Sequence, residues 1–391
     1  MYTYMLRLIG AVVSGDSLPT PPLEIDWNQV YAISKFHNVA NIVSYAVSIE
    51  NYPMENEIKQ KFLKNMFDAV LLDENQKKEF NTLFEAFEEH GIEYMPLKGI
   101  NLKKLYEASD MRNMSDGDIL IHENDRDKIS AVMEKLGYQF KKESNHELIY
   151  VKEPFINVEL HKMLIPSYND DLYGYYGDGW KLANKVGETS RYSLNAENEF
   201  IYILAHFAKH YRDGGAGIKY ILDIWLYLKK NNVDLDYIKK ELKKLGLLSF
   251  GENIIKLTKV WFENSPCDKL MVQMTKYIIE SGMYGNAKNK ALVTQMRENS
   301  AESTENHKKS TKLRLIFPTM EHMKRNYTIL NKYPYFIVFC WIWRIIRVII
   351  GKTDRRTLKK FEYITSENLS AFDLHMKNVG LDIYNGRNKK I

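Results

Sequence analysis

Cysteine is almost absent from this sequence. The 391 residues contain only two, Cys267 and Cys340, which lie far apart along the chain. Two distant cysteines cannot form a disulfide framework, and they are too few for a cysteine-based zinc site. The composition therefore excludes the small secreted proteins that disulfides hold together, and we expect a protein of the reducing cytoplasm.

A strong excess of one charge is also missing. The chain has 55 Lys and Arg against 50 Asp and Glu, a net charge of +5, and we find no internal repeat or low-complexity block. A mild, unclustered excess is typical of a solvated surface, so no specific nucleic-acid partner is predicted. The hydrophobic content of 45% is that of a globular protein, and the length suggests two domains or one with a large extension.

No apolar run is long enough to cross a bilayer. The candidate "YPYFIVFCWIWRIIRVIIG" (333–351) is interrupted by Arg344 and Arg347. Two interpretations stay open: a buried or partly buried helix, or a peripheral helix that lies on a membrane surface with its arginines at the headgroups. The N-terminal "MYTYMLRLIGAVVSGDS" has Arg7 inside its apolar stretch and no clear cleavage site, so it predicts an amphipathic helix.

The apolar spacing divides the chain into four segments. Residues 1–90 and 166–350 have apolar residues at three- and four-residue intervals and predict two helical regions, whereas 351–391 form a polar tail. Residues 91–165 alternate short strands with helices. We therefore predict an α+β protein, with a small mixed sheet flanked by N-terminal and C-terminal helical regions.

Two local predictions concern helices of the mixed segment. A third prediction concerns a polar stretch. A helix is expected over 100–109, and another over 124–138 with Asn124 as its cap. Residues 285–312 have little apolar content, which is typical of a loop or a solvated helix.

Three acidic residues of the mixed segment stand out. Asp116 and Asp118 are two apart at the start of an apolar strand, so both carboxylates lie on one face. In "NVELH" the alternation puts Glu159 and His161 on the same face of a second strand. Like charges this close repel unless a cation joins them, and Mg²⁺ prefers such oxygen ligands. The alternatives are a polar turn for the pair and an ion pair for Glu159.

Upstream, "PLKGI" ends a strand and opens a helix at Lys98 and Gly99. Glycine allows a phosphate to approach the backbone, and the first amides of a helix suit an anion. Lys98 provides a point charge, with a structural ion pair as its alternative.

These motifs together resemble the DNA polymerase β-like nucleotidyltransferase superfamily, and most closely a bacterial family of uncharacterised nucleotidyltransferases with LKG, then R-x-x-x-D-x-D, then an apolar strand. The matching positions are Leu97, Lys98, Gly99, Leu105, Tyr106, Arg112, Asp116, Asp118, Gly137, Tyr138 and Val158 to His161, with His206, His210, Lys219 and Asp223 in a later helical segment. Two positions depart from the pattern: Ser115 stands where the family tends to have Gly, and Gly117 where an apolar residue is expected.

The resemblance implies transfer of a nucleoside monophosphate from a nucleoside triphosphate such as ATP to an acceptor, with release of pyrophosphate. Asp116, Asp118 and Glu159 would hold two Mg²⁺ ions and carry the catalysis. Lys98 and Gly99 would hold the phosphates. The residues assigned by the same resemblance to nucleotide binding or to lining the cleft are Arg112, His161, His206, His210, Lys219 and Asp223.

Several of these assignments have alternatives. Arg112 either holds a phosphate or bridges carboxylates, and His161 either orients an acid or is an ordinary strand histidine. His206 and His210 share a helical face, and with Asp223 a zinc triad is the alternative to a role in the cleft.

The function itself also has alternatives. The first interpretation is an enzyme that acts on a small molecule, sugar or peptide. A catalytically weak nucleotide-binding or partner-binding module, which Gly117 would favour, and a toxin-like enzyme that modifies RNA or protein are the others.

Overall fold

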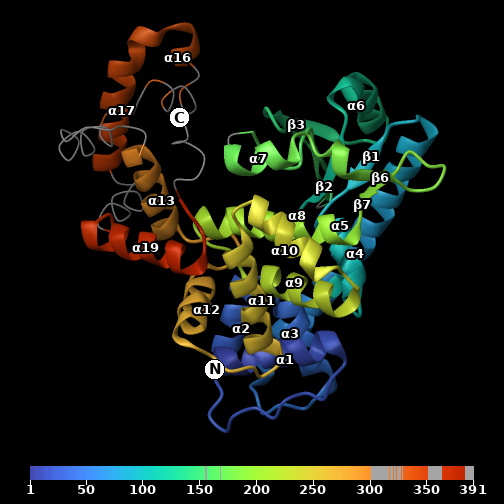
Figure 1. The fold of residues 1–391 in the computed structure, drawn as a ribbon, viewed down its shortest axis with the longest axis vertical. Helices are drawn as coiled ribbons and strands as arrows, with labels where there is room; N and C mark the ends of the chain where they lie inside the picture. Colours follow the sequence, from blue (N-terminus) through green and yellow to red (C-terminus); the bar gives the residue numbers. More distant parts are fainter. Residues whose placement is uncertain are drawn as a thin grey trace. The chain divides into compact units, whose positions relative to one another are not determined.

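The computed structural model describes residues 1–154, 156–167, 169–300, 329–350 and 363–383, together with residues 317, 320, 323 and 327. Two compact units emerge (Figure 1). The first comprises Met1–Asn286 with Lys377–Leu381, and the second Ala287–Met376 with Asp382–Ile391. These units do not follow the expected boundaries at residues 90, 165 and 350, which stay a prediction. The predicted α+β fold is confirmed by a small mixed sheet among many helices.

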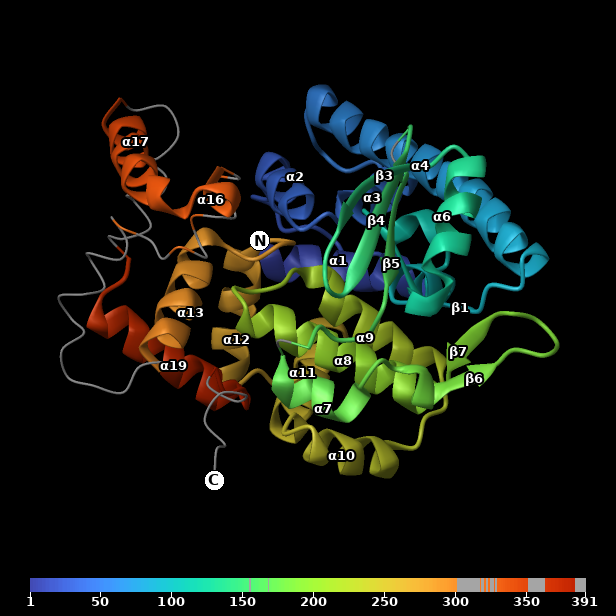
Figure 2. The same ribbon diagram turned by 90° about the horizontal axis from the view of Figure 1, so that it is seen from above.

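Helices open the first unit, as the apolar spacing predicts. Their bounds are Tyr2–Ser14 (α1), Trp27–Phe36 (α2), Ala40–Ile49 (α3) and Asn56–Glu89 (α4). The carboxylate of Asp26 accepts from the Gln29 amide and caps α2, and α1 ends at Gly15 in the left-handed conformation. The long helix α4 then runs along the sheet and covers one of its faces (Figure 2).

The sheet has five strands in the order β1-β2-β5-β4-β3. Their bounds are Tyr94–Pro96 (β1), Gly117–Ile121 (β2), Gln139–Glu143 (β3), Glu147–Lys152 (β4) and Ile156–His161 (β5). Strands β2 and β5 are parallel, and the other pairs are antiparallel. A separate hairpin, β6 (Ala183–Lys185) with β7 (Tyr192–Leu194), follows later in the chain.

The two faces of this sheet carry opposite kinds of side chain, because successive strand residues alternate. Ile119, Val158 and Leu160 point into a core shared with α4 and with α6 (Arg126–Lys135). Asp118, Glu159 and His161 belong to the other set of positions. One face is therefore structural, and the other gathers polar groups.

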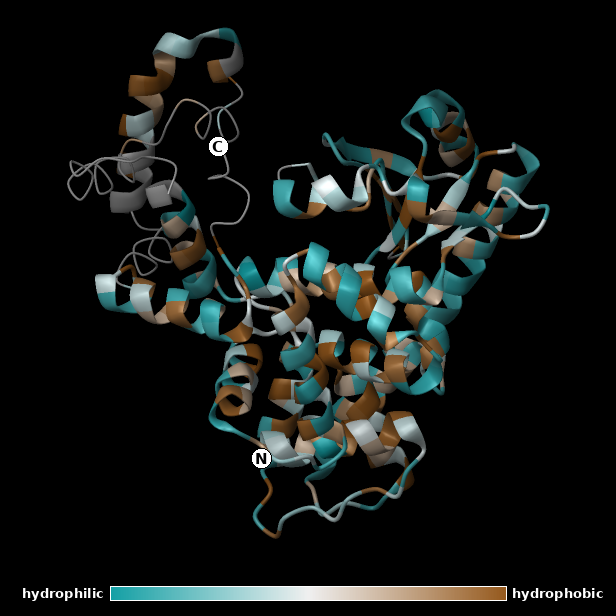
Figure 3. Ribbon diagram, viewed as in Figure 1, coloured by the Kyte–Doolittle hydropathy of each residue, from teal (hydrophilic) through white to brown (hydrophobic). Residues whose placement is uncertain are grey.

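Helices resume after the sheet, as expected. In the first unit they are α7 (Asp170–Tyr176), α8 (Ala196–Arg212), α9 (Ile218–Lys230), α10 (Leu235–Lys244), α11 (Leu248–Phe262) and α12 (Lys269–Ser281). Asn195, Asp234 and Asp268 cap α8, α10 and α12 by accepting backbone N–H groups. The apolar residues gather around α9 and α11 (Figure 3).

The second unit contributes four further described helices: α13 (Ala287–Ser300), α16 (Ile329–Lys332), α17 (Ile337–Ile350) and α19 (Ser366–Val379). Helix α13 covers the first half of the polar stretch 285–312, and the rest of that stretch lies outside the described residues. Among the residues described, no helix has the length and apolar character to cross a membrane.

Two local predictions were wrong. The helix expected over 100–109 is one turn, α5 (Gly99–Leu102), followed by a 3-10 turn, because Tyr106 turns to an extended conformation. The Tyr106 hydroxyl donates to Asp223, and this tertiary bond overrides the local helix preference. Asn124 does not cap the next helix, since α6 starts at Arg126 after a 3-10 turn and has no side-chain cap.

Candidate active site

The register of two parallel strands brings two acids together. Asp118 of β2 is the direct partner of Glu159 of β5, so their side chains share the polar face. His161 lies two residues further along β5, and its Nε2 is 2.7 Å from Asp118 Oδ1 and 3.8 Å from the nearest Glu159 oxygen. Among the described residues, these three alone converge closely enough to share a metal ion.

Asp118 is strongly paired, but through one oxygen only. The Lys98 ammonium donates to Asp118 Oδ1 at 2.6 Å, and His161 Nε2 contacts that same oxygen. Burial opposes ionisation of Asp118, but Lys98 and His161 outweigh it and hold the pKa of the carboxyl below its usual range. Oδ2 of Asp118 has no hydrogen-bond partner within the part of the chain that is described. An ionised carboxylate therefore keeps one oxygen for a further ligand.

The other two acids, Glu159 and Asp116, have an excess of negative charge around them. Burial and then the charges of Asp116 and Asp118 raise the pKa of Glu159 to about 8. Burial and Asp118 likewise raise the pKa of Asp116. Asp116 lies in the bend before β2 and outside the group that converges on one point, so its part in a metal site stays a prediction. Three carboxylates with so few protein partners form a site whose chemistry suits a divalent cation.

The turn before α5 is strained at Lys98. Its φ of 44° and ψ of −113° lie in a region that glycine favours and that L-residues rarely adopt. The strained backbone directs the ammonium to Asp118. The amides of Lys98 and Gly99 donate to no carbonyl or side chain of the described residues. Since α5 is a single turn, an anion here would depend on these two amides and the ammonium, with little contribution from a helix dipole.

Two glycines of the site are required by close packing. A Cβ on Gly99 would lie 2.7 Å from Met114 Sδ, and one on Gly117 would lie 2.1 Å from the Phe80 ring. Both distances are far below van der Waals contact. Gly117 faces α4, on the side of the sheet opposite Asp118, so the close approach of Phe80 accounts for this departure from the family pattern.

The Arg112 side chain is buried and forms an ion pair in the interior. Its Nε and one terminal nitrogen donate to the two oxygens of Asp223 of α9, each at 2.8 Å, and Tyr106 donates to the same carboxylate. Arg112 thus pairs with a single carboxylate and bridges none among the described residues, and its role in phosphate binding stays a prediction. The carboxylate of Asp223 is not turned to the two histidines of α8, which lie within hydrogen-bond distance of each other, 3.1 Å between Nε2 atoms. The structure therefore does not assemble the zinc triad.

Helix α8 carries His206, Lys209 and His210, and the charge of Lys98 acts on the first two. Burial and then Lys98 hold the pKa of His206 well below its usual value, so the imidazole is neutral. Lys209 is three residues further on, is half-buried, and has no ion-pair or hydrogen-bond partner among the residues described. Burial and Lys98 lower the pKa of its amine. Lys209 was not predicted as a site residue, although its three-residue spacing from His206 puts the two on neighbouring positions of the helix surface.

Lys219 of α9 adds a second amine without an ion-pair partner among the described residues. Its Nζ lies 3.4 Å from the Asn113 carbonyl, and burial and Arg112 lower its pKa to about 8. Asp116 and Asp118 are among the charges that act on it. A buried amine without a close carboxylate gains when an anion enters.

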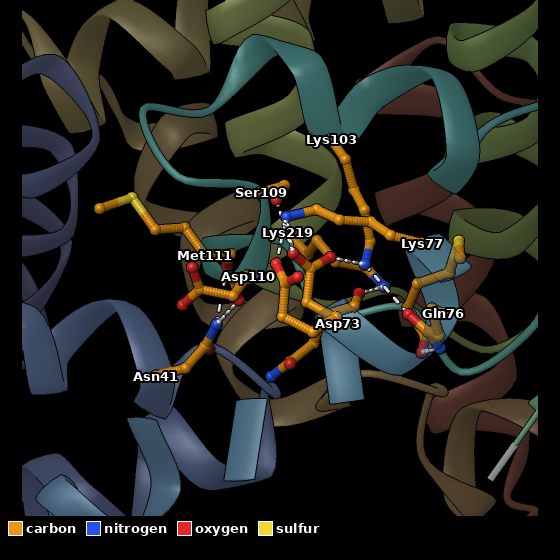
Figure 4. A network of polar contacts seen from close by, with 12 residues as sticks. Asn41, Asp73, Gln76, Lys77, Lys103, Ser109, Asp110, Met111 and Lys219 are labelled. Carbon is orange, nitrogen blue, oxygen red and sulfur yellow. Dashed lines mark hydrogen bonds and ion pairs between the residues drawn. The ribbon is translucent and has the colours of Figure 1, made fainter. Parts of the chain in front are cut away.

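A second polar network fixes the loop that leads into the acids (Figure 4). Asp73 of α4 accepts from Lys103 and from the Ser109 hydroxyl, and Lys77 lies 3.0 Å away. Asn41 of α3 donates to the carbonyls of Asp110 and Met111, and the Gln76 amide donates to that of Met114. Helices α3 and α4 thus position the segment between Lys98 and Asp116.

A hollow of about 380 Å³ adjoins this loop. Tyr284 lines it, and the Tyr284 hydroxyl is 3.0 Å from Ser115 Oγ, next to Asp116 in the chain. Asn38, which also lines it, accepts from Asn113. The other lining residues are Lys35, Phe36, Ser281, Met283 and Gly285. None of the three acids lines the hollow, whose link to the acidic segment is the contact of Tyr284 with Ser115.

A small mixed sheet with acids on one face, next to a lysine-bearing turn, is an arrangement typical of nucleotidyltransferases. In comparisons with known proteins, a family model described as an uncharacterised nucleotidyltransferase matches residues 24–263. This match covers more than half of the chain, so the protein belongs to that family of nucleotidyltransferases. No curated protein and no solved structure matches it.

Proposed function

We propose that this nucleotidyltransferase moves a nucleoside monophosphate from a nucleoside triphosphate to an acceptor hydroxyl, in a magnesium-dependent reaction that releases pyrophosphate. The observation that carries the proposal is the pairing of Asp118 with Glu159 across parallel strands, with Asp116 in electrostatic reach. A cytoplasmic location, expected from the cysteine content, is part of the same proposal.

The donor set fits magnesium. Asp116, Asp118 and Glu159 would hold two ions, because carboxylate oxygens are the ligands that Mg²⁺ prefers and Asp118 Oδ2 has no partner in the described chain. When bound, such ions stabilise negative charge on the transferring phosphoryl group. His161 contacts Asp118 through Nε2, so its part is to orient this carboxylate.

The basic groups around the acids suit a triphosphate. Lys98, with the free amides of Lys98 and Gly99, is one anion site, and Lys219 and Lys209 face the same region from α9 and α8. His206, whose imidazole is neutral, and His210 line this region as hydrogen-bonding groups. Arg112 and Asp223 hold α9 against the acidic loop and contribute through position.

Glu159 is the group we assign to proton transfer. Its carboxylate lies opposite Asp118 on the polar face, where it would accept the proton of an acceptor hydroxyl. The hollow beside Ser115 has room for a small molecule, a sugar or a short peptide. We therefore propose a small acceptor.

Incubation of the purified protein with each α-labelled nucleoside triphosphate, starting with ATP, and Mg²⁺ tests this proposal. We expect pyrophosphate release and transfer of label to an acceptor when sugars, peptides, protein and RNA are compared. Label on RNA or protein alone would replace the small acceptor by a macromolecule. Nucleotide binding without turnover, unchanged in Asp118→Ala, would leave a binding module and contradict the proposal.

A further inference from the structure

Helix α17 of the second unit exposes a continuous row of large apolar side chains. The row consists of Val338, Phe339, Ile342, Trp343 and Ile346. Their exposed fractions run from 38% at Ile346 to 66% at Phe339. Because these positions recur at helical spacing, they form one stripe along the helix.

The opposite side of α17 already provides the packing of its own unit. Ile337, Cys340 and Trp341 contact a small cluster with Met323 and Leu330. The exposed stripe therefore adds nothing to this cluster. Exposed apolar stripes of this kind mark a surface that meets a partner or a membrane.

Aromatic rings extend the stripe toward its N-terminal end. Tyr335 is 70% exposed, and Tyr333 and Phe336 are also exposed. Aromatic side chains favour the boundary between lipid headgroups and acyl chains, where an apolar ring and a polar edge both find partners.

The charge of the surrounding sequence favours a lipid surface over a second copy of the chain. Residues 322–353 contain six basic residues and no Asp or Glu: Lys324, Arg325, Lys332, Arg344, Arg347 and Lys352. Two copies that met through this segment would bring like charges together with no acid to pair them. Anionic lipid headgroups complement it.

We propose that α17 lies in the plane of an anionic membrane surface, with its exposed stripe at the acyl boundary. The helix has 14 residues, which is about 21 Å of helix against the roughly 30 Å of a hydrocarbon core. It is therefore too short to span the bilayer and lies on its surface, where the basic residues of the surrounding sequence complement anionic headgroups. This contact is independent of the proposed transfer reaction.

Co-sedimentation of the full chain with vesicles tests the proposal. One set of vesicles is pure phosphatidylcholine, and the other contains about 30% phosphatidylglycerol. The variant Phe339→Glu/Trp343→Glu places charge in the stripe. Its matched control is Phe67→Glu/Leu71→Glu, an exposed pair at the same spacing on α4, with exposed fractions of 61% and 54% against 66% and 56%.

We expect the wild type and the α4 control to bind the anionic vesicles at least about tenfold more tightly than the neutral ones. The α17 variant should lose at least about tenfold of this binding while its far-UV circular dichroism is unchanged. If that variant does not fold, Arg344→Gln/Arg347→Gln, which leaves the stripe intact, should lower binding to the anionic vesicles alone. Absence of vesicle binding, equal loss in the α4 control, or a wild-type dimer that the α17 variant converts to a monomer would overturn the proposal.

Discussion

The two faces of the five-stranded sheet differ in how completely neighbouring residues pack against or pair with their side chains. On one face Ile119, Val158 and Leu160 are fully buried against α4 and α6. On the other, Asp118 and Glu159 repel each other, with Asp116 just before β2, and only one oxygen of Asp118 is strongly paired. Neighbouring residues of a single strand, Gly117 and Asp118, thus serve opposite purposes. Mutations on the two faces should separate stability from activity.

The largest effect should come from the polar face. Asp118→Asn keeps the shape of the side chain but removes the charge that pairs with Lys98 and that we assign to metal binding. We expect nucleotidyl transfer to fall by roughly 10²–10³-fold or more, the loss typical when a group that stabilises transition-state charge is removed. Turnover of labelled nucleoside triphosphate measures it.

Glu143→Gln, a carboxyl-to-amide change on the exposed edge strand β3, is the matched control and should leave activity near that of the wild type. Equal losses of activity in the two variants, or no loss in Asp118→Asn, would contradict the assignment of activity to the polar face.

The second-largest effect should come from His37, which lies outside the sheet and contacts the start of helix α9. The fully buried His37 accepts from the Ile218 amide at the start of α9, and its Nε2 is 3.1 Å from the Ile279 carbonyl. Burial lowers the pKa of His37 to about 4. Between pH 6.5 and 4 the unfolded chain therefore takes up a proton that the folded chain refuses, and stability falls with falling pH, by on the order of 3 kcal/mol in total.

Denaturant unfolding at several pH values compares the wild type with His37→Gln. The variant should lack this part of the pH dependence. Parallel curves for the two proteins over this pH range would show that His37 is not the group responsible.

On the apolar face, Gly117→Ala should reduce stability by about 1–3 kcal/mol, because the new methyl group meets the Phe80 ring. In a Phe80→Leu background the same substitution should cost clearly less, since the ring is gone. A double-mutant cycle by chemical denaturation gives the coupling. Additive effects would mean that Phe80 is not the reason for glycine at this position.

The smallest effect on activity should come from the substitution Lys209→Met on α8. If this amine contacts the triphosphate, KM for the nucleotide should rise about tenfold with little change in kcat, and Lys209→Arg should recover part of it. Lys240→Met on the exposed side of α10 is the control. A loss of kcat without any change in KM would contradict a binding role.

The sequence alone predicted much of the sheet. The apolar run Ile119–Ile121 and the alternation in "NVELH" predicted the two parallel strands, whereas Asp116, expected on the same strand as Asp118, lies just before it. Strand β3 was missed because all five of its residues are exposed and it has no apolar face.

The rest depended on residues distant in sequence. Gly117 departs from the family pattern, and only the structure gives the reason: the ring of Phe80, far upstream in α4, packs against it. The expected helix after Lys98 breaks off because Asp223 draws Tyr106 away, a contact that no local pattern reveals. Lys209 has a visible spacing, but its burial without a partner becomes apparent only in the folded chain.

Crystals grown with Mn²⁺ and a non-hydrolysable nucleoside triphosphate analogue give the most direct test that these acids form a metal-dependent active site. We expect an anomalous peak in contact with the carboxylates of Asp118 and Glu159, at about 2.0–2.6 Å, with the phosphates beside Lys98 and Gly99. A nucleotide bound elsewhere, with no metal at the acids, would contradict the assignment.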